Sequence, residues 1–181
     1  MPPWPSRRPS PRLFDKIRLD LWGAGRAADL KTFQFGPRQQ VTDRHSKVRD
    51  VGTYALHVSC AWRVTSPMSI IVASRDRYYP SEKSGFGIDD ANFMWDQPGA
   101  NLCDERIAKL FDDHVAEASL VVDAITTDAV GGASIVLRQG FTLDIFPDDS
   151  LPDEHWRLLS PSTKTPHFVV TGNGIRARAT T

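Results

Sequence analysis

The chain has 181 residues, with 22 Lys or Arg against 22 Asp or Glu, so its formal net charge is zero. This length predicts one domain with a sizeable core, and the balanced charge provides no overall field to attract nucleic acid or an anionic membrane. No apolar run approaches the roughly 20 residues of a transmembrane helix. No secretory signal accompanies the two cysteines, so we expect a cytoplasmic protein with reduced thiols.

The first twelve residues are rich in proline and arginine and contain no acidic side chain. Such a composition cannot build a core, so we expect a disordered tail over 1–12. The alternative is a basic arm in which Arg7, Arg8 and Arg12 contact a partner. Apolar residues then recur at helical spacing and predict a short helix over 12–22.

Alternating apolar and polar side chains predict the first strands. They indicate a strand over 29–35 and, most clearly, one over 53–64. The polar segment 37–50 between them predicts a loop. A Ser-Pro turn follows the second strand, and 69–75 returns as its hairpin partner. Trp62 lies on the apolar side of its strand, so we expect it to anchor the core.

An irregular segment and a helix come next. Residues 76–100 show no periodicity, yet their many aromatic side chains argue against disorder, so we expect this segment to pack over the sheet. Asn101 is suited to cap a helix, and Asp104 and Glu105 would occupy its first turn. Apolar residues at helical spacing give that helix one buried stripe.

The rest of the chain predicts five more strands and a tail. The strands cover 118–127, 133–139, 141–146, 156–159 and 167–171. Glycines between the first three supply the positive φ of tight hairpins, so these strands form a meander. We expect a flexible tail over 176–181. The predicted fold is α+β in a single domain over 13–175, mostly an antiparallel sheet of about eight strands with one or two short helices.

One glycine-rich motif suggests a cofactor. The segment Gly23-Ala24-Gly25-Arg26-Ala27-Ala28 matches the dinucleotide-binding fingerprint, in which glycines let a helix N-terminus approach a pyrophosphate. The fingerprint requires a parallel second strand that ends in an acid about 20 residues further on. Asp43 has the spacing, but the polar residues before it do not form a buried strand. We therefore interpret the motif as a plain turn and expect no cofactor.

The candidate metal ligands and nucleophiles lack supporting patterns. The metal candidates are His57, Cys60, Cys103, His114, His155 and His167. None of them forms a chelating motif of the known spacings. His57 and Cys60 lie three residues apart on one predicted strand and so face opposite ways, which also excludes a Cys-His nucleophile. We therefore expect no metal and predict no catalytic residue.

The first candidate binding segment follows the predicted strand 69–75. It reads Arg75-Asp76-Arg77-Tyr78-Tyr79-Pro80. Arginine and tyrosine dominate recognition hot spots, and loops on a rigid sheet often carry function. The structural alternative is an ion-paired strand end with two packed tyrosines.

The second candidate is the acidic turn over 146–155, which contains Asp148, Asp149 and His155. Paired carboxylates can hold a divalent cation or act as acid and base, although a solvated turn is the simpler alternative. If this turn and the segment 75–80 leave the sheet at the same end, they would form a polar rim around an aromatic floor. The strand order, which decides this, does not follow from the sequence.

Six short segments form a pattern that resembles known proteins. They are Tyr54-Ala55-Leu56-His57, Cys60-Ala61-Trp62-Arg63, Arg75-Asp76-Arg77-Tyr78-Tyr79-Pro80, Phe146-Pro147-Asp148-Asp149-Ser150, Glu154-His155-Trp156-Arg157 and Pro166-His167-Phe168-Val169-Val170. Over 52–175 the pattern resembles a group of uncharacterised bacterial proteins of about this length. Over 118–160, hairpins that lead to an acidic turn and a Trp-Arg strand also resemble small immunity-type domains of bacterial toxin systems. Neither resemblance assigns a role to a residue.

We therefore predict a non-enzymatic binding module, of an immunity-like kind that contacts another protein. The predicted binding residues are Arg75, Asp76, Arg77, Tyr78, Tyr79, Asp148, Asp149 and His155. The alternative is a small-molecule-binding protein or hydrolase whose pocket uses the Arg, Asp, Tyr and His residues of this set. Nucleic-acid contact through the N-terminal arginines is a weaker third hypothesis, and salt-sensitive binding would mark it.

Overall fold

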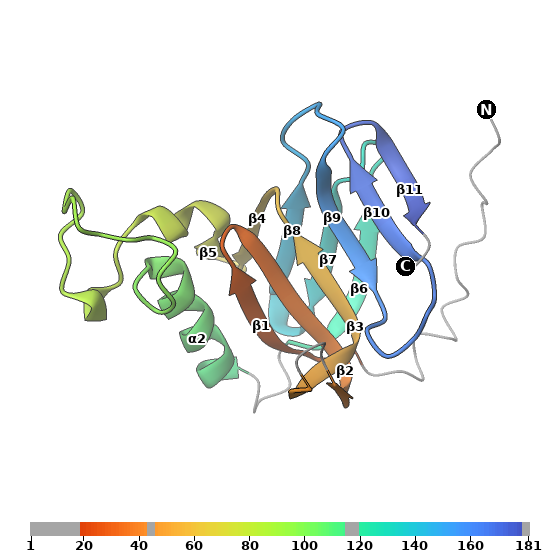
Figure 1. Ribbon diagram of the computed structural model, residues 1–181, viewed down its shortest axis with the longest axis horizontal. Helices are drawn as coiled ribbons and strands as arrows, with labels where there is room; N and C mark the ends of the chain where they lie inside the picture. The colour runs from red at the N-terminus through yellow and green to blue at the C-terminus, as the bar shows by residue number, and fades with distance from the viewer. Residues whose placement is uncertain (1–18, 43–45, 115–119, 179–181) are drawn as a thin grey trace.

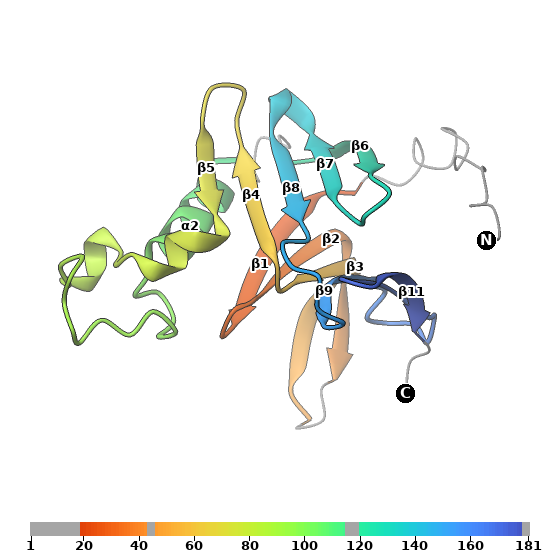
Figure 2. The same ribbon diagram turned by 90° about the horizontal axis from the view of Figure 1, so that it is seen from above.

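The computed structural model describes residues 19–42, 46–114 and 120–178. Two antiparallel sheets pack face to face, with strand orders β1-β2-β3-β9-β10-β11 and β5-β4-β8-β7-β6. Figures 1 and 2 show these two layers, with the helix α2 and a long irregular segment at one end. The fold is mostly antiparallel α+β as predicted, but the described residues form eleven strands rather than about eight.

The elements have the following bounds. The first sheet contains β1 (Leu21–Ala27), β2 (Leu30–Thr42), β3 (Val48–Val58), β9 (Glu154–Leu159), β10 (His167–Thr171) and β11 (Gly174–Arg178). The second contains β4 (Ala61–Thr65), β5 (Ile70–Ala73), β6 (Val122–Thr127), β7 (Ala133–Leu137) and β8 (Thr142–Phe146). The helix α2 spans Leu102–His114, and three 3-10 turns are η1 (Ser74–Tyr78), η2 (Glu82–Ser84) and η3 (Arg138–Gly140).

The predictions for the N-terminal part need correction. Residues 1–18, with the predicted tail and most of the predicted helix 12–22, lie outside the described residues, but Leu21 begins a strand and not a helical turn. The glycine-rich motif forms β1 itself, which turns at Ala28 (φ 52°) and pairs antiparallel with β2. This is a hairpin and not the β-α-β unit that a dinucleotide requires.

The predicted loop 37–50 is also wrong, because β2 and β3 extend through most of it as a hairpin that pairs out to Thr42 and Val48. Its residues are polar because this part of the hairpin reaches beyond the core and is solvated on both faces. There the Arg38 guanidinium lies 4.3 Å from the Trp22 ring. Hydrophobic alternation fails as a signal where neither face of a strand is buried.

The predicted single strand 53–64 is two strands in different sheets. β3 ends at Val58 and β4 begins at Ala61, and the chain crosses between the sheets at Ser59 and Cys60. The alternation of apolar and polar residues continues across this change of sheet, because the even-numbered residues of both strands point into the shared core. Trp62 is 3% exposed and meets Phe33 edge to face, with ring centroids 5.2 Å apart, which confirms it as a core residue.

The second half of the chain follows the predictions more closely. The meander β6-β7-β8 is confirmed, and the α2 cap is confirmed by the Asp104 N–H, which donates to Asn101 Oδ1 at 2.8 Å. The strand β11 was not predicted, and it extends to Arg178 within the segment expected to be a tail. No helix among the described residues is long and apolar enough to cross a membrane.

The two halves of the chain contribute to both sheets. Strands β1 to β3 meet β9 to β11 at the β3–β9 pair, and β5 and β4 meet β8 to β6 at the β4–β8 pair. The chain leaves the first sheet between β3 and β4 and returns to it between β8 and β9. These two crossings lie side by side, since both the Ser59 N–H and the Cys60 N–H donate to the His155 carbonyl.

Candidate functional site

The segment 75–80 forms η1 and the start of the irregular segment. Asp76 Oδ2 accepts hydrogen bonds from the Ala73 N–H at 3.0 Å and from Arg106 Nη1 at 2.9 Å, so it ties η1 to α2. Arg77 Nη1 donates to the Asp29 carbonyl at 2.9 Å. These two predicted binding residues therefore hold elements together, while Arg75, Tyr78 and Tyr79 are exposed.

The acidic turn surrounds a buried histidine. His155 is 4% exposed, and its Nδ1 and Nε2 lie 3.9 Å from Asp148 Oδ1 and 3.6 Å from Asp149 Oδ1. The structure thus brings together all three predicted residues of this turn. Cys60 lies beside them, and burial raises the pKa of its thiol to about 12. A thiol that stays protonated at neutral pH does not make a Cys-His nucleophile.

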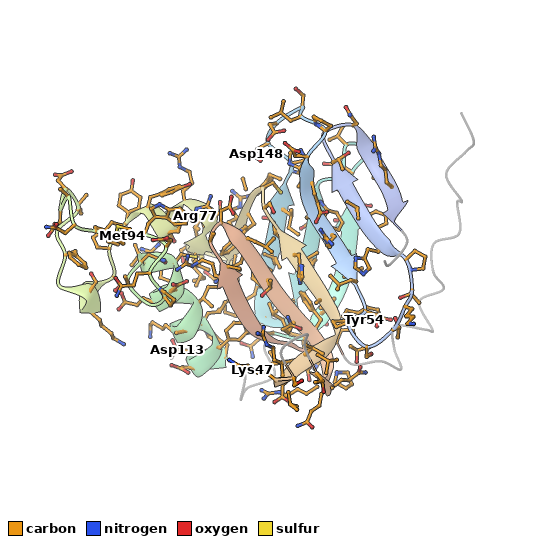
Figure 3. The ribbon with its side chains drawn as sticks, viewed as in Figure 1. Lys47, Tyr54, Arg77, Met94, Asp113 and Asp148 are labelled. Carbon is orange, nitrogen blue, oxygen red and sulfur yellow. The ribbon has the colours of Figure 1, made fainter. Side chains whose placement is uncertain are left out.

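The two predicted segments leave the second sheet at the same end. The register places Ala73 of β5 and Asp144 of β8 on either side of Arg63 in β4. The β4 strand therefore separates them, and Figure 3 shows Asp148 apart from Arg77. Within the described part of the chain, no hydrogen bond or ion pair joins 75–80 to 146–155. The two segments therefore leave the sheet at the same end, as the predicted site requires, but they do not form one cluster.

A pocket of about 530 Å³, which was not predicted from the sequence, lies between the β1–β2 hairpin and α2. Arg26 and Lys31 are direct cross-strand partners in this hairpin, and both line the pocket. Loop residues 96–99 and the first turns of α2 complete its wall, with Asp104 facing Arg26. The signal was present in the sequence, since Lys31 shares the parity of Phe33 and therefore lies on the buried side of its strand.

The donors that bind Asp104 are Arg26, Gly99 and Asn101, and not Lys31. It accepts from Arg26 Nε at 3.1 Å and Arg26 Nη2 at 2.9 Å, and also from the Gly99 N–H and Asn101 Nδ2. Burial raises the pKa of Asp104, but the bonds from Arg26 and Gly99 outweigh this and hold the pKa below its ordinary value. Oδ2 accepts three of these bonds and Oδ1 accepts one, so most of the accepting capacity of this carboxylate is used.

Lys31 is a buried cation without an anion of its own. It is 3% exposed, and its Nζ lies 6.0 Å from the centre of the Trp62 ring. Among the residues of the three described ranges, none accepts a hydrogen bond from Nζ. Burial lowers the pKa of Lys31, and it outweighs the nearby Cys103 and Asp104, which raise this pKa. Burial raises the pKa of the nearby Cys103 to about 11, so that thiol is neutral at pH 7 and does not balance the ammonium.

A second hollow of about 470 Å³ opens between the two sheets. Apolar side chains form nearly all of its wall, including Phe35 and Tyr54 from the first sheet and Ile125 and Ile135 from the second. A specific ligand site needs a few polar groups that fix the orientation of the ligand. The pocket at Arg26 and Lys31 has such groups, so it is the stronger candidate.

Arg26, Lys31 and Asp104 place two fixed cations and one occupied carboxylate at the wall of a pocket, which suits recognition of a negatively charged group. Asp96 also lines this pocket, but it is exposed. Comparison with protein-family models, curated proteins and solved structures finds no match for the chain.

Proposed function

We propose that this protein binds a small anionic molecule in the pocket between the β1–β2 hairpin and α2. The observation that carries the proposal is Lys31, a residue that is only 3% exposed, lines the pocket wall and has no hydrogen-bond acceptor for its ammonium among the described residues. A carboxylate or phosphate group in the pocket would supply the missing acceptor and the missing negative charge.

The energetics of Lys31 favour a functional role over a structural one. An unpaired ammonium in an apolar environment destabilises the folded state unless it finds a partner. A structural role would be filled better by an apolar side chain of similar length, such as methionine. A residue that lowers stability in the free protein is typical of a binding site that a ligand completes.

The pocket also has a suitable size and a defined polarity. Its volume of about 530 Å³ lies within the range of about 300–1,000 Å³ that small-molecule sites occupy. Arg26 is held in place by two parallel hydrogen bonds to Asp104 and by bonds from Nη1 and Nη2 to backbone carbonyls, so its positive charge is fixed at the pocket wall. Ile107 and Phe111 of α2 give the pocket apolar wall on the opposite side from the hairpin. We infer a ligand with one anionic end and a compact apolar body.

The experiment is a thermal-shift and calorimetric titration with inorganic phosphate, acetate, malonate and citrate as probes. We expect at least one of these anions to raise the Tm of the wild-type protein and to bind with one-to-one stoichiometry. Lys31→Met should abolish this response. Lys109→Met, which removes an exposed lysine of α2 paired with Asp113, should retain it. Equal anion binding by Lys31→Met and wild type would refute the proposal.

A second candidate function is contact with a partner protein, as in an immunity-like module. Exposed apolar side chains support it, because Tyr78, Tyr79, Ile88 and Met94 are all 46% exposed or more. They lie on the irregular segment that projects from one end of the molecule (Figures 1 and 3), and the Arg77 guanidinium stacks on Tyr78. Aromatic, methionine and arginine side chains are enriched at protein interfaces.

The test of this second candidate is titration against the proteins encoded by neighbouring genes. The double variant Tyr79→Ala/Met94→Ala should weaken binding and leave the Tm within error of wild type, because both side chains are about half exposed or more. Binding of unchanged strength would exclude this surface as the interface.

A further inference from the structure

A second cluster of potential ligand atoms lies at the corner where the chain crosses between the sheets. The Cys60 Sγ, one ring nitrogen of His155 and a carboxylate oxygen of Asp148 all lie within 4.8 Å of one another. Asp148 Oδ1 lies 3.9 Å from His155 Nδ1, and Asp149 Oδ1 lies 3.6 Å from Nε2, so the two carboxylates face different nitrogens of the ring. Cys60 and His155 are buried, while Asp148 and Asp149 are exposed.

Backbone pairing holds the two buried members of this cluster in place. The Ser59 N–H and Cys60 N–H donate to the His155 carbonyl at 2.8 and 3.2 Å. On either side of the corner, Val58 pairs with Trp156 in the first sheet and Ala61 pairs with Phe146 in the second. The thiol and the imidazole therefore come from a rigid corner, and the turn after β8 brings the carboxylates to it.

The imidazole of His155 provides an independent indication of a ligand. Its Nε2 is buried and has no hydrogen-bond partner in the described residues. Buried polar side-chain atoms are nearly always hydrogen-bonded, so one without a partner calls for an explanation. A metal ion coordinated by this ring would supply one.

We propose that Cys60, Asp148 and His155 bind a divalent transition metal of the zinc class. One thiolate and one imidazole favour zinc or cobalt over magnesium or calcium, which prefer oxygen ligands alone. Three protein ligands, with a solvent molecule in the fourth position, match the open coordination of catalytic zinc sites. The sequence analysis expected no metal because these residues form no local motif, and only the two sheet crossings bring them together.

The cluster needs a small contraction to coordinate a metal. In a tetrahedral zinc site, neighbouring ligand atoms lie about 3.3–3.6 Å apart, so the widest separation would shorten by roughly 1 Å. The side chain of Asp148 is 55% exposed, so its rotation can bring its carboxylate closer to the buried thiol and imidazole. Binding converts the Cys60 thiol to a thiolate, and its proton is released to solvent.

The test uses Zn²⁺ and Co²⁺ as probes on the full chain. We expect one equivalent of Zn²⁺ to bind, and Co²⁺ to give a thiolate-to-metal charge-transfer band with tetrahedral visible bands. Cys60→Ser should abolish the charge-transfer band, and His155→Gln should abolish tight binding. The matched controls Cys103→Ser and His167→Gln, which alter the same residue types elsewhere, should behave as wild type.

A further variant keeps the test independent of folding defects in the core. Asp148→Asn/Asp149→Asn changes only half-exposed side chains and should weaken Zn²⁺ binding about tenfold or more. No stoichiometric binding by the wild-type protein, or undiminished binding by Cys60→Ser or by the double Asn variant, would overturn the proposal. Lys31→Met should bind metal as wild type does, so this site and the anion pocket can fail separately.

Discussion

The segment 75–80 and the pocket at Lys31 both place charged residues beside α2, but their charges are balanced differently. In the first, Asp76 is paired with Arg106, and Arg77 donates to a backbone carbonyl although its Nε is buried without a partner among the described residues. In the second, Arg26 donates to Asp104 and to backbone carbonyls, and Lys31 is left without an acceptor among the described residues. The density of polar residues along a sequence therefore does not show which of them lack a partner, because only the tertiary contacts decide this.

The largest change in stability is expected when the Arg26–Asp104 ion pair of the pocket is broken. Asp104→Ala would leave Arg26, whose side chain is 8% exposed, without its carboxylate beside the already unpaired Lys31. Removal of one partner from such a pair should lower the free energy of unfolding by about 3 kcal/mol, measured by urea denaturation. Asp113→Ala, which breaks the exposed pair with Lys109, should change stability little. Equal effects of the two substitutions would show that Arg26 does not depend on Asp104.

The next effect has the opposite sign. Lys31→Met should raise the free energy of unfolding by about 1–3 kcal/mol, because it removes an unsatisfied buried cation and keeps a side chain of similar length. Urea denaturation without added anions measures this change. A loss of stability would mean that Lys31 has a structural partner and that the contrast with the segment 75–80 is false.

A pH series refines the same difference. Burial lowers the pKa of Lys31 below its ordinary value of 10.5, so between the folded-state pKa and 10.5 the unfolded chain binds more protons. Stability that depends on Lys31 therefore rises with pH across this window. The advantage of Lys31→Met over wild type should be largest at neutral pH and should shrink toward pH 10.5. An advantage that stays constant with pH would assign it to packing and not to charge.

The smallest effect is expected in the segment that the sequence singled out. Arg75 is exposed, and no ion pair of Arg75 occurs within the described ranges. Arg75→Ala should change the free energy of unfolding by no more than about 0.5 kcal/mol in thermal or urea unfolding. A clear loss of stability would show that this arginine belongs to the architecture, as Asp76 does.

The sequence predicted elements where one face is buried and failed where this condition does not hold. Alternation identified the apolar side of 53–64 and the buried Trp62. The chain changes sheet at Ser59 and Cys60 without interrupting this alternation, so the change could not be predicted from the pattern. The hairpin over β2 and β3 was read as a loop because its outer half is solvated on both faces. Local patterns therefore report burial, and they do not report which sheet a strand joins.

The candidate sites show the same limit. The sequence predicts the acidic turn as one segment, since its members are neighbours in the chain. Cys60 joins it only through the crossing between sheets, and no spacing rule connects the two. Lys31 could have been found, because a lysine at a core position of a predicted strand is unusual. Its lack of an acceptor depends on the four donors that occupy Asp104, which only the tertiary structure reveals.

The β3–β9 and β4–β8 strand pairs join the two halves of the chain, and this has a consequence for how the protein can be divided. A cut at the exposed Ile88 would separate β1 to β5 from β6 to β11, and each fragment would carry strands of both layers with unpaired edges at β3, β4, β8 and β9. Neither fragment could bury the central strands alone. Together the two fragments would form the β3–β9 and β4–β8 pairs again. The chain is thus suited to split-fragment complementation, in which folding becomes a bimolecular association whose extent depends on fragment concentration.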